Sequence, residues 1–232
     1  MASIKTSLSD KGWVLIKNKS NIDKDELLKL ARAIGVPIAS RRHGSLLDKL
    51  RLQEVHEANP NSLSAIHGTG TFPLHSDTAH WKTPARFVIL FAKEIKSACY
   101  PTILMDTTVL DFDETKYEVL KRGIFTVKNG RRSFLTTIIS NSEKNSSEFI
   151  RYDQGCMKPA NKTGETADKY LNKLIDNAEP IIVNWEQGDL LIFDNWRFLH
   201  GRGQKGNEAL NIDRLLYRVL IMNHGEGNNI GY

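Results

Sequence analysis

The stretch Phe72-Pro73-Leu74-His75-Ser76-Asp77-Thr78 carries the most informative pattern in this sequence. Its histidine and its carboxylate stand two positions apart, and alternate side chains of an extended strand leave on the same face. His75 and Asp77 are therefore predicted to point at one common atom. A single pair of this kind arises easily by chance in a chain with seven histidines, so the prediction depends on other parts of the sequence.

A second histidine, His200, completes the pattern. It follows an apolar run and stands just before Gly201-Arg202-Gly203, which we interpret as a turn. Two imidazoles and one carboxylate on one face of a metal leave its other positions open, and this is the ligand set of non-haem Fe(II) oxygenases. A closed zinc site would favour four protein ligands, commonly with cysteine, and the sequence contains no Cys-x-x-Cys. His75, Asp77 and His200 are thus predicted to bind Fe(II).

Two further residues strengthen this interpretation. Arg214 lies fourteen residues after His200, and Thr102 lies twenty-seven residues after His75, each at the start of an apolar strand. The whole constellation resembles the taurine dioxygenase family, including its clavaminate-synthase-like members, over nearly the whole chain, residues 12 to 223. The strongest matches are Leu74–Asp77, Gly188–Asn195, His200–Arg202 and Asp213-Arg214.

The resemblance implies both a fold and a co-substrate. Members of the family have a double-stranded β-helix, or jelly-roll, core and use Fe(II), 2-oxoglutarate and O2. An arginine on the last strand, aided by a threonine, binds the distal carboxylate of 2-oxoglutarate, and Arg214 and Thr102 match those positions. A planar guanidinium suits a carboxylate because it donates two parallel hydrogen bonds. The alternatives are an ion pair between Arg214 and Asp213 and an ordinary strand role for Thr102.

The resemblance also implies a reaction. 2-Oxoglutarate is decarboxylated to succinate and CO2 while an unactivated C–H of a small molecule is oxidised, normally to an alcohol. No catalytic residue beyond the metal ligands is implied. Clavaminate-like enzymes often act on amino acids, so the expected substrate is an amino acid or a natural-product intermediate. Desaturation or cyclisation with the same cofactors, and a non-catalytic metal-binding jelly roll, are the alternatives.

Arg218 is the first candidate for substrate binding. It shares a strand face with Arg214, and the matching later arginine of taurine dioxygenase holds the sulfonate of its substrate. A guanidinium turned into a β core is costly unless paired. We therefore expect Arg218 to bind an anionic group of the substrate, with a fixed internal salt bridge to Asp189 or Asp194 as the alternative.

Three more residues are candidates for the substrate wall. The segment Arg151-Tyr152-Asp153 resembles the substrate strand of clavaminate-like enzymes, so Arg151 and Asp153 are included, with Asp153 receiving a substrate cation. A solvated turn near Gly155 is the alternative for Asp153. His80 lies in the loop after Asp77, which covers the site in the family.

Composition sets the outer bounds. The chain has 232 residues, of which 40% are hydrophobic, enough for one domain spanning residues 1–232. It has no apolar run of about 18 residues, so no membrane span is expected. The N-terminus lacks the apolar core of a signal peptide, which favours a cytoplasmic protein with Cys99 and Cys156 reduced. The oligomeric state is not indicated.

The net charge of +5 raises the question of nucleic acid. The basic residues are scattered, and no zinc finger, RNA-recognition signature or basic helix accompanies them. A nucleic-acid demethylase of the AlkB type shares the metal ligands but usually has two arginines six residues apart. Arg214 and Arg218 are four apart, so no nucleic-acid partner is expected.

The secondary-structure pattern is mainly β with flanking helices. Strands are expected over residues 12–18, 86–92, 101–106, 123–127, 133–139, 149–153, 180–185, 190–194 and 215–222, and helices over 24–34, 111–122 and 166–178. Asp23 and Glu26 form a predicted capping box, and Asn129-Gly130 predicts a hairpin. Residues 40–70 are expected to be irregular, and residues 140–148 a mobile loop.

Overall fold

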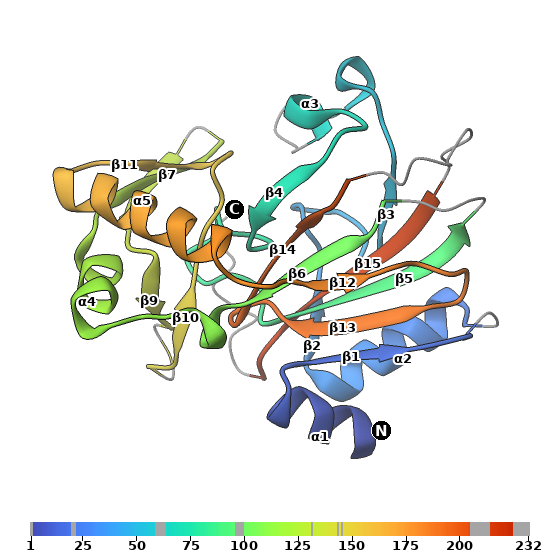
Figure 1. Cartoon of the computed structure of the whole chain (residues 1–232). Coiled ribbons are helices and arrows are strands. Elements are labelled where there is room, and N and C mark those ends of the chain that lie inside the picture. Colours follow the sequence, from blue (N-terminus) through green and yellow to red (C-terminus); the bar gives the residue numbers. More distant parts are fainter. Residues whose placement is uncertain are drawn as a thin grey trace.

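Two antiparallel sheets pack face to face in the computed structural model of this chain (Figure 1). The structure describes residues 2–19, 22–58, 64–95, 100–130, 132–142, 144, 146–204 and 214–224. In the larger sheet the strand order is β1 (Trp13–Ile16), β13 (Leu190–Asp194), β5 (Phe87–Ile95), β15 (Arg214–Met222) and β2 (Val36–Ile38), and β3 (Asp48–Arg51) also pairs with β15. In the smaller sheet the order is β12 (Ile181–Val183), β6 (Thr102–Asp106), β14 (Phe198–Arg202) and β4 (Phe72–His75).

Strand β5 runs through the middle of the larger sheet. The five residues that follow Phe87 in this strand are buried, so both of its faces are covered. Its alternating side chains divide between two apolar clusters. Val88 and Leu90 pack between the two sheets, whereas Ile89 and Phe91 pack on the other face, beneath the N-terminal helices. A nearly continuous apolar run predicts burial on both faces. Each large apolar side chain that is fully buried contributes about 1.5–3 kcal/mol to the free energy of folding.

Helices α1 (Ala2–Asp10) and α2 (Lys24–Ile34) cover the outer face of the larger sheet (Figure 1). The predicted capping box is present at α2: the Asp23 carboxylate accepts from the backbone N–H of Glu26 at 2.8 Å, and the Glu26 carboxylate accepts from that of Asp23 at 3.2 Å. Leu27 and Ala31 are fully buried against the sheet. This helix has the predicted bounds.

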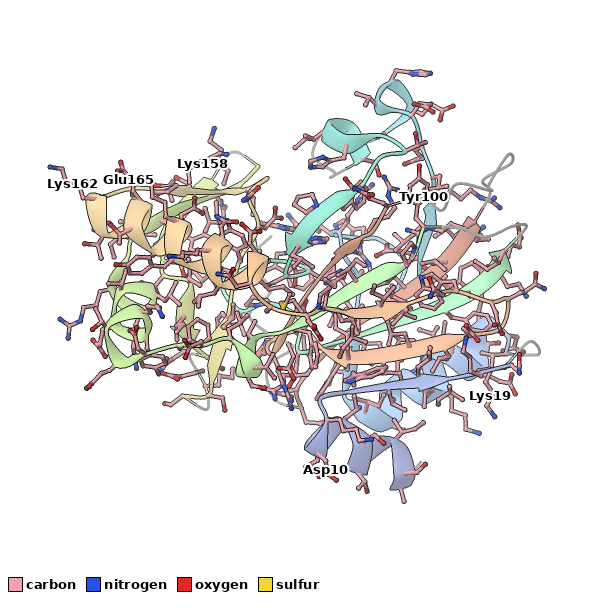
Figure 2. The ribbon with its side chains drawn as sticks, viewed as in Figure 1. Asp10, Lys19, Tyr100, Lys158, Lys162 and Glu165 are labelled. Atoms are coloured by element: carbon pink, nitrogen blue, oxygen red, sulfur yellow. The ribbon has the colours of Figure 1, made fainter. Side chains whose placement is uncertain are left out.

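A second group of elements packs at one end of the sheets (Figure 1). It consists of α4 (Glu114–Arg122), α5 (Lys162–Asp176), β7 (Phe125–Asn129), β8 (Arg132–Thr136), β9 (Ile139–Asn141), β10 (Glu148–Ile150) and β11 (Met157–Pro159). A third apolar cluster joins this group to Met105 and Leu199 of the smaller sheet. Its outer surface carries charged side chains, including Lys158, Lys162 and Glu165 (Figure 2). The Asn-Gly hairpin between β7 and β8 is confirmed, with Gly130 at φ +58°.

Short helical elements complete the described chain. They are η1 (Val55–Glu57) and α3 (Ser64–His67), which precede β4, and η2 (Thr107–Val109), which follows β6. No helix among the described residues is long and apolar enough to cross a membrane.

The predicted turn at Gly201-Arg202-Gly203 is wrong. Residues Phe198–Arg202 form β14, and every one of them is buried. A side chain at Gly201 would meet the backbone carbonyl oxygen of Phe72 on the neighbouring strand at 2.6 Å. The glycine is therefore explained by the close approach of β4, not by a turn.

Three other expectations change in part. The expected mobile loop over residues 140–148 includes the ends of β9 and β10, which pair with each other, and residues 143 and 145 lie outside the described chain. The irregular region over residues 40–70 contains β3, whose short polar sequence gives no strand pattern. Helix α5 begins four residues before the predicted start, because Asn161 caps it and Gly164 fits closely against Ile124.

Candidate metal centre

The two predicted metal-binding histidines lie directly opposite each other. His75 ends β4 and His200 lies in β14, and the antiparallel register pairs their Cα atoms. Their ring centroids are 4.4 Å apart, and both residues are 8% exposed. Residues 125 positions apart in sequence are thus brought together by the pairing of two strands.

Asp77 reaches the same point by a different route from the one predicted. Strand β4 stops at His75, and Thr78 has φ +57°, so Asp77 is placed by a turn and not by strand alternation. Its Oδ2 lies 3.6 Å from Nε2 of His200. One ligand atom from each of His75, Asp77 and His200 lies within 4.8 Å of the other two.

The polar atoms of these three residues suit a cation. Nδ1 of His75 lies 3.0 Å from the carbonyl oxygen of Pro73; donation to that carbonyl leaves Nε2 free to bind a metal. Oδ2 of Asp77 is buried without a hydrogen-bond partner among the described residues. Burial and the neighbouring His75 lower the pKa of His200 to about 3, so its imidazole is neutral. Two imidazoles and an orphaned carboxylate oxygen fit Fe(II).

Asn195 holds the backbone of Asp77 on both sides. Its Oδ1 accepts from the N–H of Asp77 at 2.8 Å, and its Nδ2 donates to the Asp77 carbonyl at 3.0 Å and to the Ala85 carbonyl at 2.8 Å. The side chain is fully buried. Sequence reasoning alone assigns no role to Asn195, although it belongs to the match over residues 188–195, because its partners lie more than one hundred positions away.

Arg151 holds the same loop further along. Its guanidinium donates to the carbonyl oxygens of Ala79 at 3.0 Å, Trp81 at 2.6 Å and Lys82 at 2.5 Å. It is 1% exposed, and burial lowers its pKa to about 10. The predicted direct contact between Arg151 and a substrate is not favoured by this placement, since its two terminal nitrogens already donate to the loop that follows Asp77.

Arg218 joins the carboxylates of Asp77 and Asp48. Its Nη1 donates to Oδ1 of Asp77 at 2.6 Å, and its Nη2 donates to Oδ2 of Asp48 at 2.9 Å. The expected alternative, an internal salt bridge, is therefore present but with other partners: Asp189 pairs with Lys17, and Asp194 with Arg86.

These charges oppose the effect of burial on the metal ligand. Burial acts to raise the pKa of Asp77, but the charge of Arg218 holds that pKa below its ordinary value. Burial likewise acts against the charge of Arg218, and Asp77 and Asp48 raise the pKa of Arg218 above its ordinary value. Because Oδ1 of Asp77 is bound to Arg218, Oδ2 is the oxygen that faces the two histidines.

Thr102 and Arg214 lie on facing sheets, at the starts of β6 and β15. The Thr102 hydroxyl accepts from Nε1 of Trp185 at 3.0 Å, which leaves its own proton available for donation. Nη1 of Arg214 donates to the carbonyl oxygen of Tyr100 at 2.7 Å. Both residues are buried. Asp213, the expected alternative partner of Arg214, lies outside the described residues.

His80 and Asp153 form part of the same surroundings. Burial lowers the pKa of His80, while the charges of Asp153 and Asp77 act to raise it. Oδ1 of Asp153 accepts from the N–H of Gly155 at 2.7 Å. The turn expected near Gly155 is thus present. Cys156 is a free thiol, whose pKa burial raises, and Cys99 lies outside the described residues.

A cavity of about 710 Å³ is lined by other residues. It is lined by residues of α1, α4, β9 and β10, together with Arg86, Asp194 and Trp196. None of the predicted site residues lines it, so the size of a cavity does not locate the metal centre in this molecule.

Comparison with solved structures places the fold. An asparagine oxygenase in complex with Fe(II), 3-hydroxyasparagine and succinate superposes with a TM-score of 0.72 at 15% identity, covering 96% of this chain and 79% of that one. The PvcB protein from Pseudomonas aeruginosa gives 0.71 at 17% identity, covering 95% and 79%. The non-haem iron oxygenase OrfP, in complex with Fe, succinate and (3S)-hydroxy-L-Arg, gives 0.71 at 19% identity, covering 95% and 78%.

These similarities show that the chain has the jelly-roll fold of iron oxygenases, which confirms the predicted fold class. No protein-family model matches the sequence, and no curated protein does. At such low identity the relation lies in the fold, and the chemistry has to be argued from this chain's own residues.

Proposed function

We propose that this protein is an Fe(II)- and 2-oxoglutarate-dependent dioxygenase that hydroxylates an unactivated C–H of a small molecule, most simply an amino acid or a natural-product intermediate. The observation that carries the proposal is the buried cluster of His75, Asp77 and His200, in which one carboxylate oxygen has no partner among the described residues. Three protein ligands leave positions open for a co-substrate and O2.

The predicted metal-binding and co-substrate-binding residues each have a defined part in this proposal. His75, Asp77 and His200 hold the iron, which supplies the activation of O2 when it is bound with 2-oxoglutarate. Arg214 and Thr102 bind the distal carboxylate of that co-substrate. A guanidinium with a neighbouring hydroxyl donor suits a carboxylate, and the hydrogen bond from Trp185 orients the Thr102 hydroxyl. The surrounding protein positions the substrate and excludes water.

The substrate class rests on the charged groups beside the metal cluster. Arg218 is paired with Asp77 and Asp48, but each of its Nη atoms carries a second hydrogen that can donate to a substrate anion, and Asp153 offers an acceptor for a substrate cation. A zwitterionic amino acid carries both groups. Two of the structurally similar proteins are described with hydroxylated asparagine and hydroxylated arginine, which supports this class. Arg151 acts in the proposal through the loop that it holds.

The setting is part of the proposal. A free thiol at Cys156 suits a reducing compartment, which supports a cytoplasmic location. A single domain over the whole chain, the absence of a nucleic-acid partner and the absence of membrane association belong to the same proposal.

The experiment is a screen for succinate release, with Fe(II), 2-oxoglutarate and O2, over free amino acids and small natural-product scaffolds. Stoichiometric succinate with a product heavier by one oxygen is expected for the true substrate. A product lighter by two hydrogens identifies desaturation or cyclisation. If wild type binds iron but forms succinate no faster than His200→Ala with every compound, the protein is a non-catalytic jelly roll.

A further inference from the structure

Arg202 belongs to the sequence match around His200, yet the proposed function gives it no role. It lies in β14 two positions after His200, so both side chains leave on the same face of the strand. The register of β14 with β6 pairs Arg202 with Thr102. Arg202 is therefore a cross-strand neighbour of the threonine proposed to bind the distal carboxylate of 2-oxoglutarate.

The partners of Arg202 are all uncharged. Its Nε donates to the carbonyl oxygen of Gly70, and its Nη2 to that of Gly68, both at 2.5 Å. The guanidinium lies 3.8 Å from the ring centroid of Phe72 and 5.3 Å from that of Tyr100. The residue is 4% exposed. Within the described part of the chain, no carboxylate compensates this buried charge.

Tyr100 links Arg202 to Arg214. Its ring faces the Arg202 guanidinium, and its carbonyl oxygen accepts from Nη1 of Arg214; it lies on the α3 side of the two sheets (Figure 2). Burial first, and then the charge of Arg214, lower the pKa of Arg202 to about 10. Arg202 is thus still charged at neutral pH, and two cations lie close enough to repel each other.

A desolvated cation is costly unless an anion lies near it. Hydrogen bonds to two carbonyls satisfy donors but leave the charge unbalanced. Arg202 lies across the strand from Thr102, and the charge of Arg214 acts on it. The positive charges of both arginines therefore act on the space beside Thr102. A dicarboxylate whose free end lies there would balance this charge.

We propose that Arg202 is the second cation of the co-substrate pocket and makes it selective for a 2-oxo acid with a distal carboxylate. This inference rests on the proposed function. Arg202 acts through its charge on the distal carboxylate, in addition to holding the Gly68–Gly70 segment against β14.

The test compares two 2-oxo acids in the same protein. 2-Oxoglutarate and pyruvate chelate iron through the same atoms, but pyruvate has no distal carboxylate. Apparent dissociation constants are measured anaerobically with Fe(II), from the absorbance band that a chelated 2-oxo acid produces. Wild type, Arg202→Gln, Arg202→Met and Arg202→Lys are compared, with melting temperatures measured alongside.

The two neutral variants are expected to bind 2-oxoglutarate about tenfold or more weakly, while pyruvate affinity changes less than about twofold. Arg202→Lys keeps the charge and is expected to stay within about threefold of wild type for 2-oxoglutarate. Equal effects on both acids, or a lower melting temperature with unchanged preference, would show that Arg202 only holds the chain.

Failure of this inference can be distinguished from failure of the proposed function. If wild type gives no band with either acid, the proposed function is wrong, and with it the inference. If wild type gives a band and the neutral variants keep its preference, only the inference is wrong. Should neither neutral variant fold, Arg202→Lys decides: a retained preference for 2-oxoglutarate supports the role of the charge, and a lost preference overturns it.

Discussion

Arg218 and Arg202 are two inward-facing arginines with opposite surroundings. Arg218 lies between the carboxylates of Asp77 and Asp48, so its charge is compensated at the metal cluster. Arg202 donates to backbone carbonyls and stacks on aromatic rings. Among the described residues, the charge of Arg218 is therefore compensated beside the metal ligands, whereas that of Arg202, across the strand from Thr102, has no carboxylate partner. This difference indicates where the free carboxylate of a dianionic co-substrate is attracted.

A third buried arginine sharpens the comparison and gives the largest expected effect. Arg151, like Arg202, donates to carbonyls, but these belong to the loop after Asp77. Arg151→Met leaves three loop carbonyls without their donor, so we expect a loss of about 3–5 kcal/mol in the free energy of unfolding. Urea denaturation measures it.

The matched control is Arg122→Met on the exposed face of α4, where the arginine side chain is 77% exposed. It should change the same free energy by no more than about 0.5 kcal/mol. A stability of Arg151→Met equal to that of the control would contradict a role in holding the loop.

The next effect concerns Arg218 and the substrate. Arg218→Gln removes a charge-assisted donor, so substrate KM should rise by the equivalent of about 1.5–3 kcal/mol, or roughly tenfold to 150-fold, with the KM for 2-oxoglutarate barely changed. Steady-state kinetics with each substrate varied in turn gives both values. If the affinity for iron falls while substrate KM stays constant, Arg218 acts only on Asp77, as its 2.6 Å ion pair allows.

A smaller effect is expected from the amide that holds the metal ligand. Asn195→Ala frees both backbone groups of Asp77, and loss of such a supporting partner typically weakens metal binding about 10–100-fold. Anaerobic Fe(II) titration measures the change. Asn172→Ala, which removes an amide bonded to Tyr152 and to its own helix, is the control and should bind iron as wild type does. Equal affinities in the two variants would remove Asn195 from the account.

The two histidines show what local sequence can predict. His75 is recognisable from its spacing to Asp77, and His200 from the apolar run before it; the spacing to Thr102 and Arg214 fits a known family. Their meeting depends on strand register, which the observed pairing of β4 with β14 supplies. The jelly-roll core came from the resemblance, since strand periodicity does not choose between β folds.

The residues that support the site show what local sequence cannot predict. Asn195, Asp48 and Arg202 act through partners from 118 to 170 positions away in the chain, and the identity of such partners is a property of the folded molecule. Asp77 lies beside the two histidines as predicted, but a turn places it there and not strand alternation, because the strand ends at His75. A polar residue in an apolar run indicates that something pairs with it, but not what.

The central claim is that His75, Asp77 and His200 bind Fe(II) with positions open for 2-oxoglutarate. Anaerobic titration of the whole protein tests it most directly. We predict one Fe(II) per chain and an absorbance band on addition of 2-oxoglutarate. Both should be lost in His200→Ala and kept in His56→Ala, which changes a histidine in the exposed element η1. Unchanged iron affinity in His200→Ala would contradict the account.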